Sequence, residues 1–211
     1  GISPDRIQVC PYGVDVGLFS LKAYPSIDEL KERPIRFVYV GGVKELKGIS
    51  YLLQAFAQIP RSEAVLTVVG QANSSAEDIR PYAKRVCFVG SVLHDEVPRI
   101  LADADVFIFA SLGEGMSLSI LEAAACGLPL IISENSGVND QLTEGVEGFT
   151  VPIQSVDALF EKARWFIDHP EAIEPMGRAA RKMALRFSWE NYDKRIAEIF
   201  ATIGVRDGKT R

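Results

Sequence analysis

A glycine-rich segment with one well-placed lysine is the first feature able to do chemistry. Gly41 and Gly42 follow an apolar run, and Lys47 stands immediately before a stretch with helical spacing. A glycine backbone can approach a ligand closely, and an ammonium beside the amides of a helix N-terminus can bind a phosphate. The residue order is neither that of a P-loop nor GxGxxG. A glycine turn with solvated lysines is the alternative interpretation.

Two glutamates eight positions apart form the second feature. Glu114 lies in a loop after an apolar run, and Glu122 lies inside the helix expected to follow. One carboxylate can accept hydrogen bonds from two neighbouring sugar hydroxyls, and the amides at a helix start can bind an anion. The alternative is a capping Glu114 and an ordinary helical Glu122, although a charge inside an apolar stretch needs a partner. The nucleotide-sugar clamp that we predict here consists of Glu114, Gly115, Met116, Ser117, Leu118 and Glu122.

A third segment, Gly90, Ser91 and Val92, carries less information. It follows an apolar run, and its exposed backbone groups could contact the edge of a base. A plain strand end is the competing interpretation. In an open parallel sheet, ligands bind in the crevice at the carboxyl ends of the strands. We therefore expect all three segments to lie at one edge of one sheet.

The elements that must position these segments follow from the apolar pattern. Short runs rich in β-branched and aromatic residues alternate with segments of helical spacing. This alternation is typical of an α/β protein with a Rossmann-like, doubly wound parallel sheet. The predicted strands are residues 35–40, 64–69, 86–89, 105–110, 128–132 and 148–151. The predicted helices are residues 48–59, 78–84, 95–104, 117–126, 139–143, 155–168, 171–186 and 189–203.

Three parts of the chain differ in character. Residues 1–30 form an irregular linker and lead-in segment, residues 31–187 form the Rossmann-like nucleotide-sugar-binding domain, and residues 188–211 contain a C-terminal helix. Apolar residues recur with helical spacing in that last helix, so it is expected to cover another surface. They are Trp189, Tyr192, Ile196, Ile199 and Phe200.

Composition excludes several classes of protein. The 211 residues are 47% hydrophobic and 24% charged, with a net charge of -5 and a pI of about 5.2, which gives no global attraction to nucleic acid. The three cysteines have no CxxC spacing, and only two histidines are present. A disulfide framework or zinc site is therefore not expected, and the cysteines fit a reducing cytoplasm. No run reaches the roughly 18 apolar residues of a membrane span.

Nearly the whole chain resembles the C-terminal domain of the retaining glycosyltransferases called group 1, or family 4. The E-x7-E pattern from Glu114 to Glu122 is the most informative match, and it continues as Glu-Ala-Ala-Ala-Cys-Gly-Leu-Pro-Leu-Ile. The other matches are Pro11-Tyr12-Gly13-Val14-Asp15 with Phe19, residues 37–53 with the family's F-VGR and KG signature, and Gly145-Val146-Glu147-Gly148-Phe149 with Val151-Pro152.

The resemblance implies one lobe of a GT-B fold and a role for each segment. Lys47 would contact the donor diphosphate. Glu114 would contact the transferred sugar, helped by the amides of residues 116–118, and Glu122 would bind the ribose hydroxyls. Gly90 to Val92 would border the base. In that scheme Lys47 and Glu114 are the catalytic pair, and no metal or other cofactor is needed, because Lys47 and the helix dipole neutralise the leaving diphosphate.

Two residues depart from the family pattern. Gly42 stands where the family usually has arginine, so one of two expected cations is absent, although Lys44 is close in sequence. Ser117 stands where glycine is common. Both departures bear on which donor binds and how tightly.

The resemblance also implies a second lobe before Gly1. The length, the start at glycine and the apolar last helix lead us to expect an absent N-terminal, acceptor-binding lobe. Any contact with the inner face of a membrane would be made through it, in an otherwise cytoplasmic protein. The full-length protein would be a glycosyltransferase of the hexosyltransferase type, and this chain alone would be inactive.

Two other functions remain open at this point. A nucleotide-sugar epimerase can share the GT-B fold, although the E-x7-E pattern favours transfer. A non-catalytic binding or interaction module is the other possibility, and the absence of arginine at Gly42 supports it.

Overall fold

A parallel sheet forms the centre of the molecule. The structure, a computed structural model, describes residues 2–3, 6–71, 80–82 and 85–207. These residues form a six-stranded, all-parallel sheet with strand order β3-β2-β1-β4-β5-β6. That order and direction confirm the predicted doubly wound fold. The strands are β1 (Ile35–Val40), β2 (Ala64–Val69), β3 (Cys87–Gly90), β4 (Val106–Phe109), β5 (Leu130–Ser133) and β6 (Gly148–Val151).

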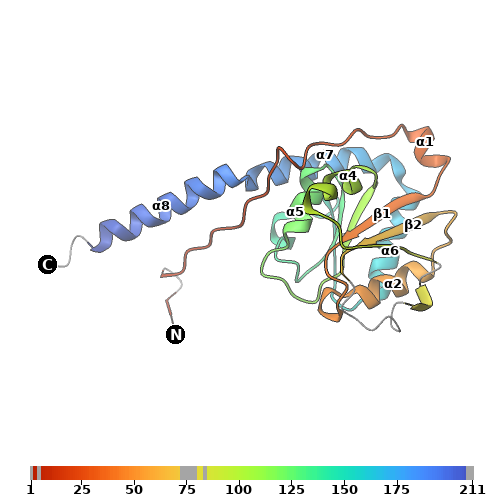
Figure 1. The fold of residues 1–211 in the computed structure, drawn as a ribbon, viewed down its shortest axis with the longest axis horizontal. Helices are drawn as coiled ribbons and strands as arrows, with labels where there is room; N and C mark the ends of the chain where they lie inside the picture. The colour runs from red at the N-terminus through yellow and green to blue at the C-terminus, as the bar shows by residue number, and fades with distance from the viewer. Residues whose placement is uncertain (1, 4–5, 72–79, 83–84, 208–211) are drawn as a thin grey trace.

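Helices cover both faces of the sheet (Figure 1). On one face lie α2 (Ile49–Ala57) and α6 (Val156–Asp168), and on the other lie α4 (Val97–Ala102), α5 (Leu118–Ala125) and α7 (Ile173–Ala184). All residues of β4 and β5 are consequently buried, which explains why all of them except Ser133 are apolar. Short 3-10 turns join these elements: η2 (Glu45–Lys47), η3 (Arg80–Tyr82), η4 (His94–Glu96), η5 (Asn139–Gln141), η6 (Pro170–Ala172) and η7 (Leu185–Phe187).

Several predicted bounds differ from the observed ones by a few residues, and the predicted helix 139–143 is the 3-10 turn η5. Two of the differences have identifiable reasons. The segment expected to be irregular contains helix α1 (Ile27–Lys31), which begins with a capping box in which Ser26 and Glu29 cap each other. Strand β5 begins at Leu130 rather than 128, because the Leu128 amide still closes the end of α5 by donating to the Ala123 carbonyl, 3.0 Å away. The predicted helix 78–84 lies largely outside the described residues, of which only η3 falls within it.

The last helix, α8 (Trp189–Asp207), leads away from the lobe on the same side as the N-terminal residues (Figure 1). Its first turn is anchored, since the Val14 amide donates to the Phe187 carbonyl at 2.7 Å and a side chain at Gly13 would collide with Trp189. Beyond that turn Tyr192, Ile196 and Ile199 are half-buried, and Phe200 is 67% exposed. That α8 covers a further lobe stays a prediction.

Candidate functional site

The loop after β1 is held tightly against the neighbouring strand. The Tyr39 hydroxyl donates to the Gly42 carbonyl at 2.9 Å, and burial raises the pKa of this phenol well above its usual range. Gly48 has a φ of 65°, and a Cβ there would overlap the Ala110 carbonyl oxygen. Glycine is therefore required at position 48. Its absence of a side chain lets η2 press against the end of β4 and places Lys47 at that strand's carboxyl end.

The loop after β4 meets the first loop directly. The Leu46 carbonyl accepts hydrogen bonds from the Leu112 amide at 2.9 Å and from the Ser111 hydroxyl at 3.1 Å. Above this junction the Lys47 ammonium forms an ion pair with Glu114 Oε1, and Ser111 Oγ donates to the same oxygen at 2.8 Å. Two residues predicted separately from the sequence thus lie in contact.

The position of this pair within the sheet is informative. β1 and β4 are neighbours, and the chain continues from them toward opposite edges of the sheet, to β2 and to β5. Such a topological switch point is where open α/β sheets bind ligands. Lys47 and Glu114 are only 26% and 14% exposed, so the charges lie in a partly desolvated environment where electrostatic interactions are strengthened.

The loop after β5 supports the Glu114 loop from beneath, a role that the sequence analysis missed. The Asn135 carbonyl accepts the Glu114 amide at 2.8 Å, and the Ser136 carbonyl accepts the Ser117 amide at 3.3 Å. Gly137, with a φ of 73°, lies so close to the Gly115 carbonyl that a Cβ would collide with it. The Ser117 amide, expected to face an anion, is therefore already engaged within the protein.

The start of α5 and the loop before it leave open space around Glu114. A Cβ at Gly113 or Gly115 would meet no atom of the described residues within 4 Å, so contacts within the chain do not require glycine there. Helix α5 begins at Leu118 with Ser117 as its N-cap, whose hydroxyl pairs with Ser119 Oγ instead of capping the helix. Amides of the first turn thus remain available to an anion.

Glu122, the second predicted glutamate, lies on α5 and is only 12% exposed. Its Oε1 lies 2.9 Å from His94 Nε2, at the start of η4. The need for a partner, foreseen from the apolar surroundings of Glu122, is met by a histidine that the sequence analysis did not select. The signal available in the sequence was its position four residues after Gly90.

Comparison with known proteins assigns the family. A model of the family described as Glycosyl transferases group 1 matches residues 34–169, which include both glutamates and Lys47. The chain belongs to the group 1 glycosyltransferases. The match begins just before β1 and ends after α6.

Individual relatives agree with this assignment. The D-inositol 3-phosphate glycosyltransferase of Segniliparus rotundus is 30% identical over 204 residues, covering 89% of this chain and 45% of that protein. HepE of Anabaena, solved with UDP-glucose, superposes with a TM-score of 0.81 at 21% identity, covering 96% of this chain and 59% of HepE. The C-terminal domain of a group 1 protein, LpcC of Francisella tularensis, gives a TM-score of 0.68 at 19% identity, covering 82% and 97%.

The extent of the matches shows which part of these relatives the chain resembles. It spans about half the length of the curated relatives it matches, while it matches almost all of the isolated LpcC domain. It therefore corresponds to the C-terminal lobe of the two-lobed GT-B enzymes.

Gly90, Ser91 and Val92 lie further from the pair in this glycosyltransferase lobe. Gly90 is the last residue of β3, and Ser91 and Val92 follow this strand, which β2 separates from β1. Gly90 has a φ of 82° and its carbonyl accepts the Gly70 amide at 2.8 Å, while the Ser91 side chain is exposed. Among the described residues, this segment is linked to the rest of the predicted site through His94 and Glu122.

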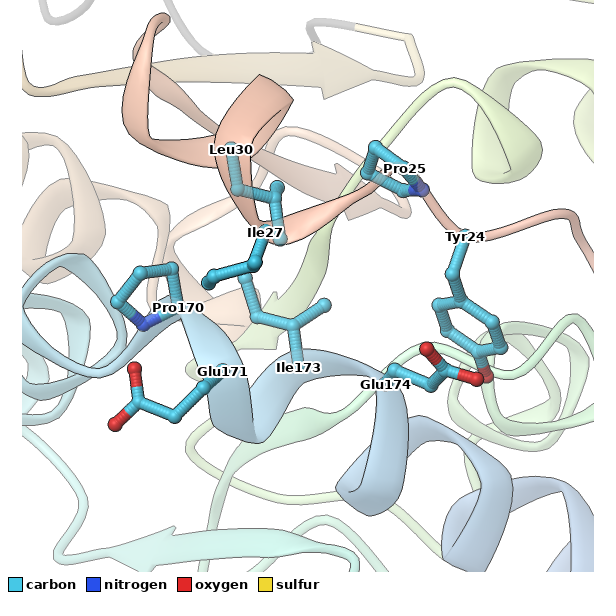
Figure 2. A pocket seen from close by; sticks show the side chains of 8 residues that line it. All are labelled: Tyr24, Pro25, Ile27, Leu30, Pro170, Glu171, Ile173 and Glu174. Atoms are coloured by element: carbon cyan, nitrogen blue, oxygen red, sulfur yellow. The ribbon is translucent and has the colours of Figure 1, made fainter.

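Three larger cavities, of about 400 to 470 Å³, also lie on this lobe, and one of them is lined in part by Gly115 and Met116. A cavity of about 60 Å³ beside α1 is lined in part by Ile27, Leu30 and Ile173, which point toward one another (Figure 2). It is far below the roughly 300 Å³ of a small-molecule pocket. Within the described residues there is no group of three metal-ligating side chains, and no helix is long and apolar enough to cross a membrane.

Proposed function

We propose that this chain is the donor-binding lobe of a retaining glycosyltransferase, which transfers a sugar from a nucleoside diphosphate sugar to an acceptor of unknown identity. The observation that carries the proposal is the contact between Lys47 and Glu114 at the switch point of the sheet. A cation and a carboxylate meet there beside the start of a helix. This arrangement suits a ligand with an anionic part next to a polyol.

Lys47 acts on the diphosphate. Its ammonium is held by Glu114 in the free lobe, and the donor's phosphate oxygens would take over this cation together with amides at the start of α5. As the bond between sugar and diphosphate breaks, negative charge grows on the leaving oxygen. A fixed cation and helix amides stabilise that charge without reorganisation.

Glu114 contacts the transferred sugar. Its carboxylate stays anchored by the Ser111 hydroxyl when Lys47 turns to the phosphates, so the other oxygen can accept from sugar hydroxyls. Glu122 accepts from the ribose hydroxyls, and the backbone of residues 90–92 borders the base. Transfer requires the acceptor-binding lobe, so this chain by itself binds the donor and shows little transfer.

The reaction in this proposal uses no metal and takes place in the cytoplasm. Lys47 and the α5 dipole supply the positive charge that a divalent ion would otherwise provide. The cysteines fit a reducing compartment, since Cys10, Cys87 and Cys126 are all unpaired. Burial raises the pKa of the Cys126 thiol to about 12, which keeps it unreactive.

Calorimetric titration with UDP, GDP, ADP and their glucose conjugates tests the proposal. We expect one nucleotide series to bind, with the same affinity in EDTA as in magnesium. Lys47→Ala and Glu122→Ala should each weaken it, while Lys162→Ala, which removes an exposed ion pair with Glu144, should not. No binding at millimolar concentration would contradict the proposal. Unchanged binding in both site variants would instead favour an interaction module.

A further inference from the structure

His94 is a candidate for a role in the site because of where η4 holds it. The turn before α4 is closed by Glu96, whose carboxylate accepts the Leu93 amide at 2.8 Å. The His94 ring and the buried Phe19 ring pack in a T-shaped arrangement, with centroids 5.4 Å apart and planes at 67°. The imidazole is thus oriented by two elements besides Glu122, although its side chain is 66% exposed.

The hydrogen bond between His94 and Glu122 has a defined direction. An ionised carboxylate only accepts hydrogen bonds, so the proton between the two groups belongs to His94 Nε2. Glu122 Oε1 is therefore held in place, while in the described part of the chain no group donates to Oε2. Glu122 Oε2 is therefore available to a ligand, and Oε1 keeps one lone pair that a ligand can also use.

We propose that His94 is a positioning residue that orients the Glu122 carboxylate to recognise the vicinal hydroxyls of a ribose. The inference rests on the proposed function, because it takes Glu122 as the group that binds the ribose. A diol presents two donors about as far apart as the two oxygens of a carboxylate, so recognition depends on the orientation of the carboxylate plane. Without His94 that plane can rotate, and the advantage of two hydroxyls over one is lost.

The predicted consequence is a change in selectivity and not only in affinity. Calorimetry first identifies which of UDP, GDP and ADP binds most tightly. The affinity for that nucleotide is then compared with the affinity for its 2′-deoxy counterpart. The unmodified chain should prefer the ribose form about tenfold or more, since a hydrogen bond to a charged group is lost. His94→Ala should reduce this preference to within about threefold. His94→Gln, whose amide can donate from a similar position, should restore most of it.

Controls separate this role from a structural one. Urea unfolding of His94→Ala should keep a single cooperative transition with a slightly lower midpoint, because His94 is 66% exposed while Glu122, which is 12% exposed, loses its partner. His169→Ala is the matched histidine control: His169 stacks on Trp165, outside the proposed site, and should leave the preference unchanged.

Each outcome decides a different claim. If Glu122→Gln abolishes the ribose preference while His94→Ala keeps it, the positioning role is wrong and the proposed function stands. If His94→Ala weakens the affinity for both nucleotides equally, the positioning role is also wrong, since His94 would then act on a part of the ligand other than the diol. If Glu122→Gln keeps the preference, the assignment of Glu122 to the ribose fails, and His94 fails with it. No binding by any diphosphate would overturn both proposals.

Discussion

The same two neighbouring strands carry an ion pair at each end, and the two pairs differ in kind. At the amino end, Asp105 is 1% exposed and accepts three hydrogen bonds, two from the Arg33 guanidinium at 2.6 and 2.9 Å and one from the Arg36 amide at 2.8 Å. At the carboxyl end, Glu114 is 14% exposed and accepts from Lys47 and Ser111 at a single oxygen. One end is satisfied within the chain, and the other keeps acceptor capacity for a ligand.

Burial and saturation separate a structural ion pair from a functional one here. The amino end lies beside the buried Lys22, whose pKa is lowered by burial and only partly restored by the charge of Asp105. The pKa of Arg33 is raised, chiefly by its hydrogen bonds to Asp105. At the amino end, Arg33 and Asp105 are held by each other, and no ligand could replace either of them without breaking the fold. The carboxyl-end pair faces open space above Gly113 and Gly115, so a ligand can replace either partner.

Breaking the amino-end pair should give the largest effect. Asp105→Ala removes the acceptor of a bidentate guanidinium and leaves the Arg36 amide without it, which should lower the free energy of unfolding by about 3 kcal/mol. Urea denaturation followed by circular dichroism measures this. Molecules that remain folded should still bind the nucleoside diphosphate with unchanged affinity. If the free energy of binding changes by more than the free energy of unfolding, the two ends of the strands are coupled.

Breaking the carboxyl-end pair should reverse that pattern. Lys47→Ala should weaken nucleoside diphosphate binding by about ten- to hundredfold, because a hydrogen-bonded charge is lost. The free energy of unfolding should change by less than about 1 kcal/mol, since the pair is partly solvated. Calorimetry and urea denaturation on one preparation provide both numbers. A large loss of stability would mean that the pair is structural after all.

Much of the fold could be predicted because the decisive signals are local. β1 was delimited to the residue, since Pro34 precedes it and Gly41 follows it. Helix α1 was missed although Ser26 and Glu29 form a capping box, because five residues are too few to show apolar periodicity. The start of β5 was misplaced because the end of α5 is set by a hydrogen bond from Leu128, which apolar pattern alone does not reveal.

The site could be predicted only where strand ends determine it. Lys47 and Glu114 follow parallel strands, so their meeting needed only the fold. The contact of His94 with Glu122 depends on how η4 is placed beside α5, and His94 next to Asp95 and Glu96 resembles an ordinary charged surface. Asn135 supports the Glu114 loop through its backbone carbonyl, which accepts the Glu114 amide, and through its side-chain amide, which donates to the Leu112 carbonyl at 3.1 Å. The first of these contacts leaves no side-chain pattern in the sequence.

A steric probe should sharpen the comparison with a smaller effect. Gly115→Val adds a side chain where the described residues have no atom within 4 Å, so stability should hold while ligand binding weakens by about tenfold through overlap. Gly137→Ala is the matched contrast: its φ of 73° and its contact with the Gly115 carbonyl should make this change destabilising. Unaltered calorimetric binding in Gly115→Val would place the ligand elsewhere.

The smallest expected effect comes from adding a charge to the carboxyl end. A side chain at Gly41 would force the buried Tyr39 ring to shift, because a Cβ would lie 2.9 Å from the Tyr39 hydroxyl. Gly42 is not so constrained: a Cβ would lie 3.5 Å from Lys44 Cε, an ordinary contact, so Gly42→Arg should fold normally. If the carboxyl end lacks a second cation, this change should tighten diphosphate binding about three- to fivefold.

The same variant can show whether Lys44 already supplies that charge. Its methylenes occupy the space over Gly42. Lys44→Ala should then weaken diphosphate binding in the unmodified chain but not in Gly42→Arg, a coupling that a double-mutant cycle measures. The monophosphate serves as the control, because a cation that meets the second phosphate should leave its affinity unchanged. Weaker diphosphate binding in Gly42→Arg would instead mean that the ligand approaches the bare backbone of Gly42, and the carboxyl end would then be limited by space rather than by charge.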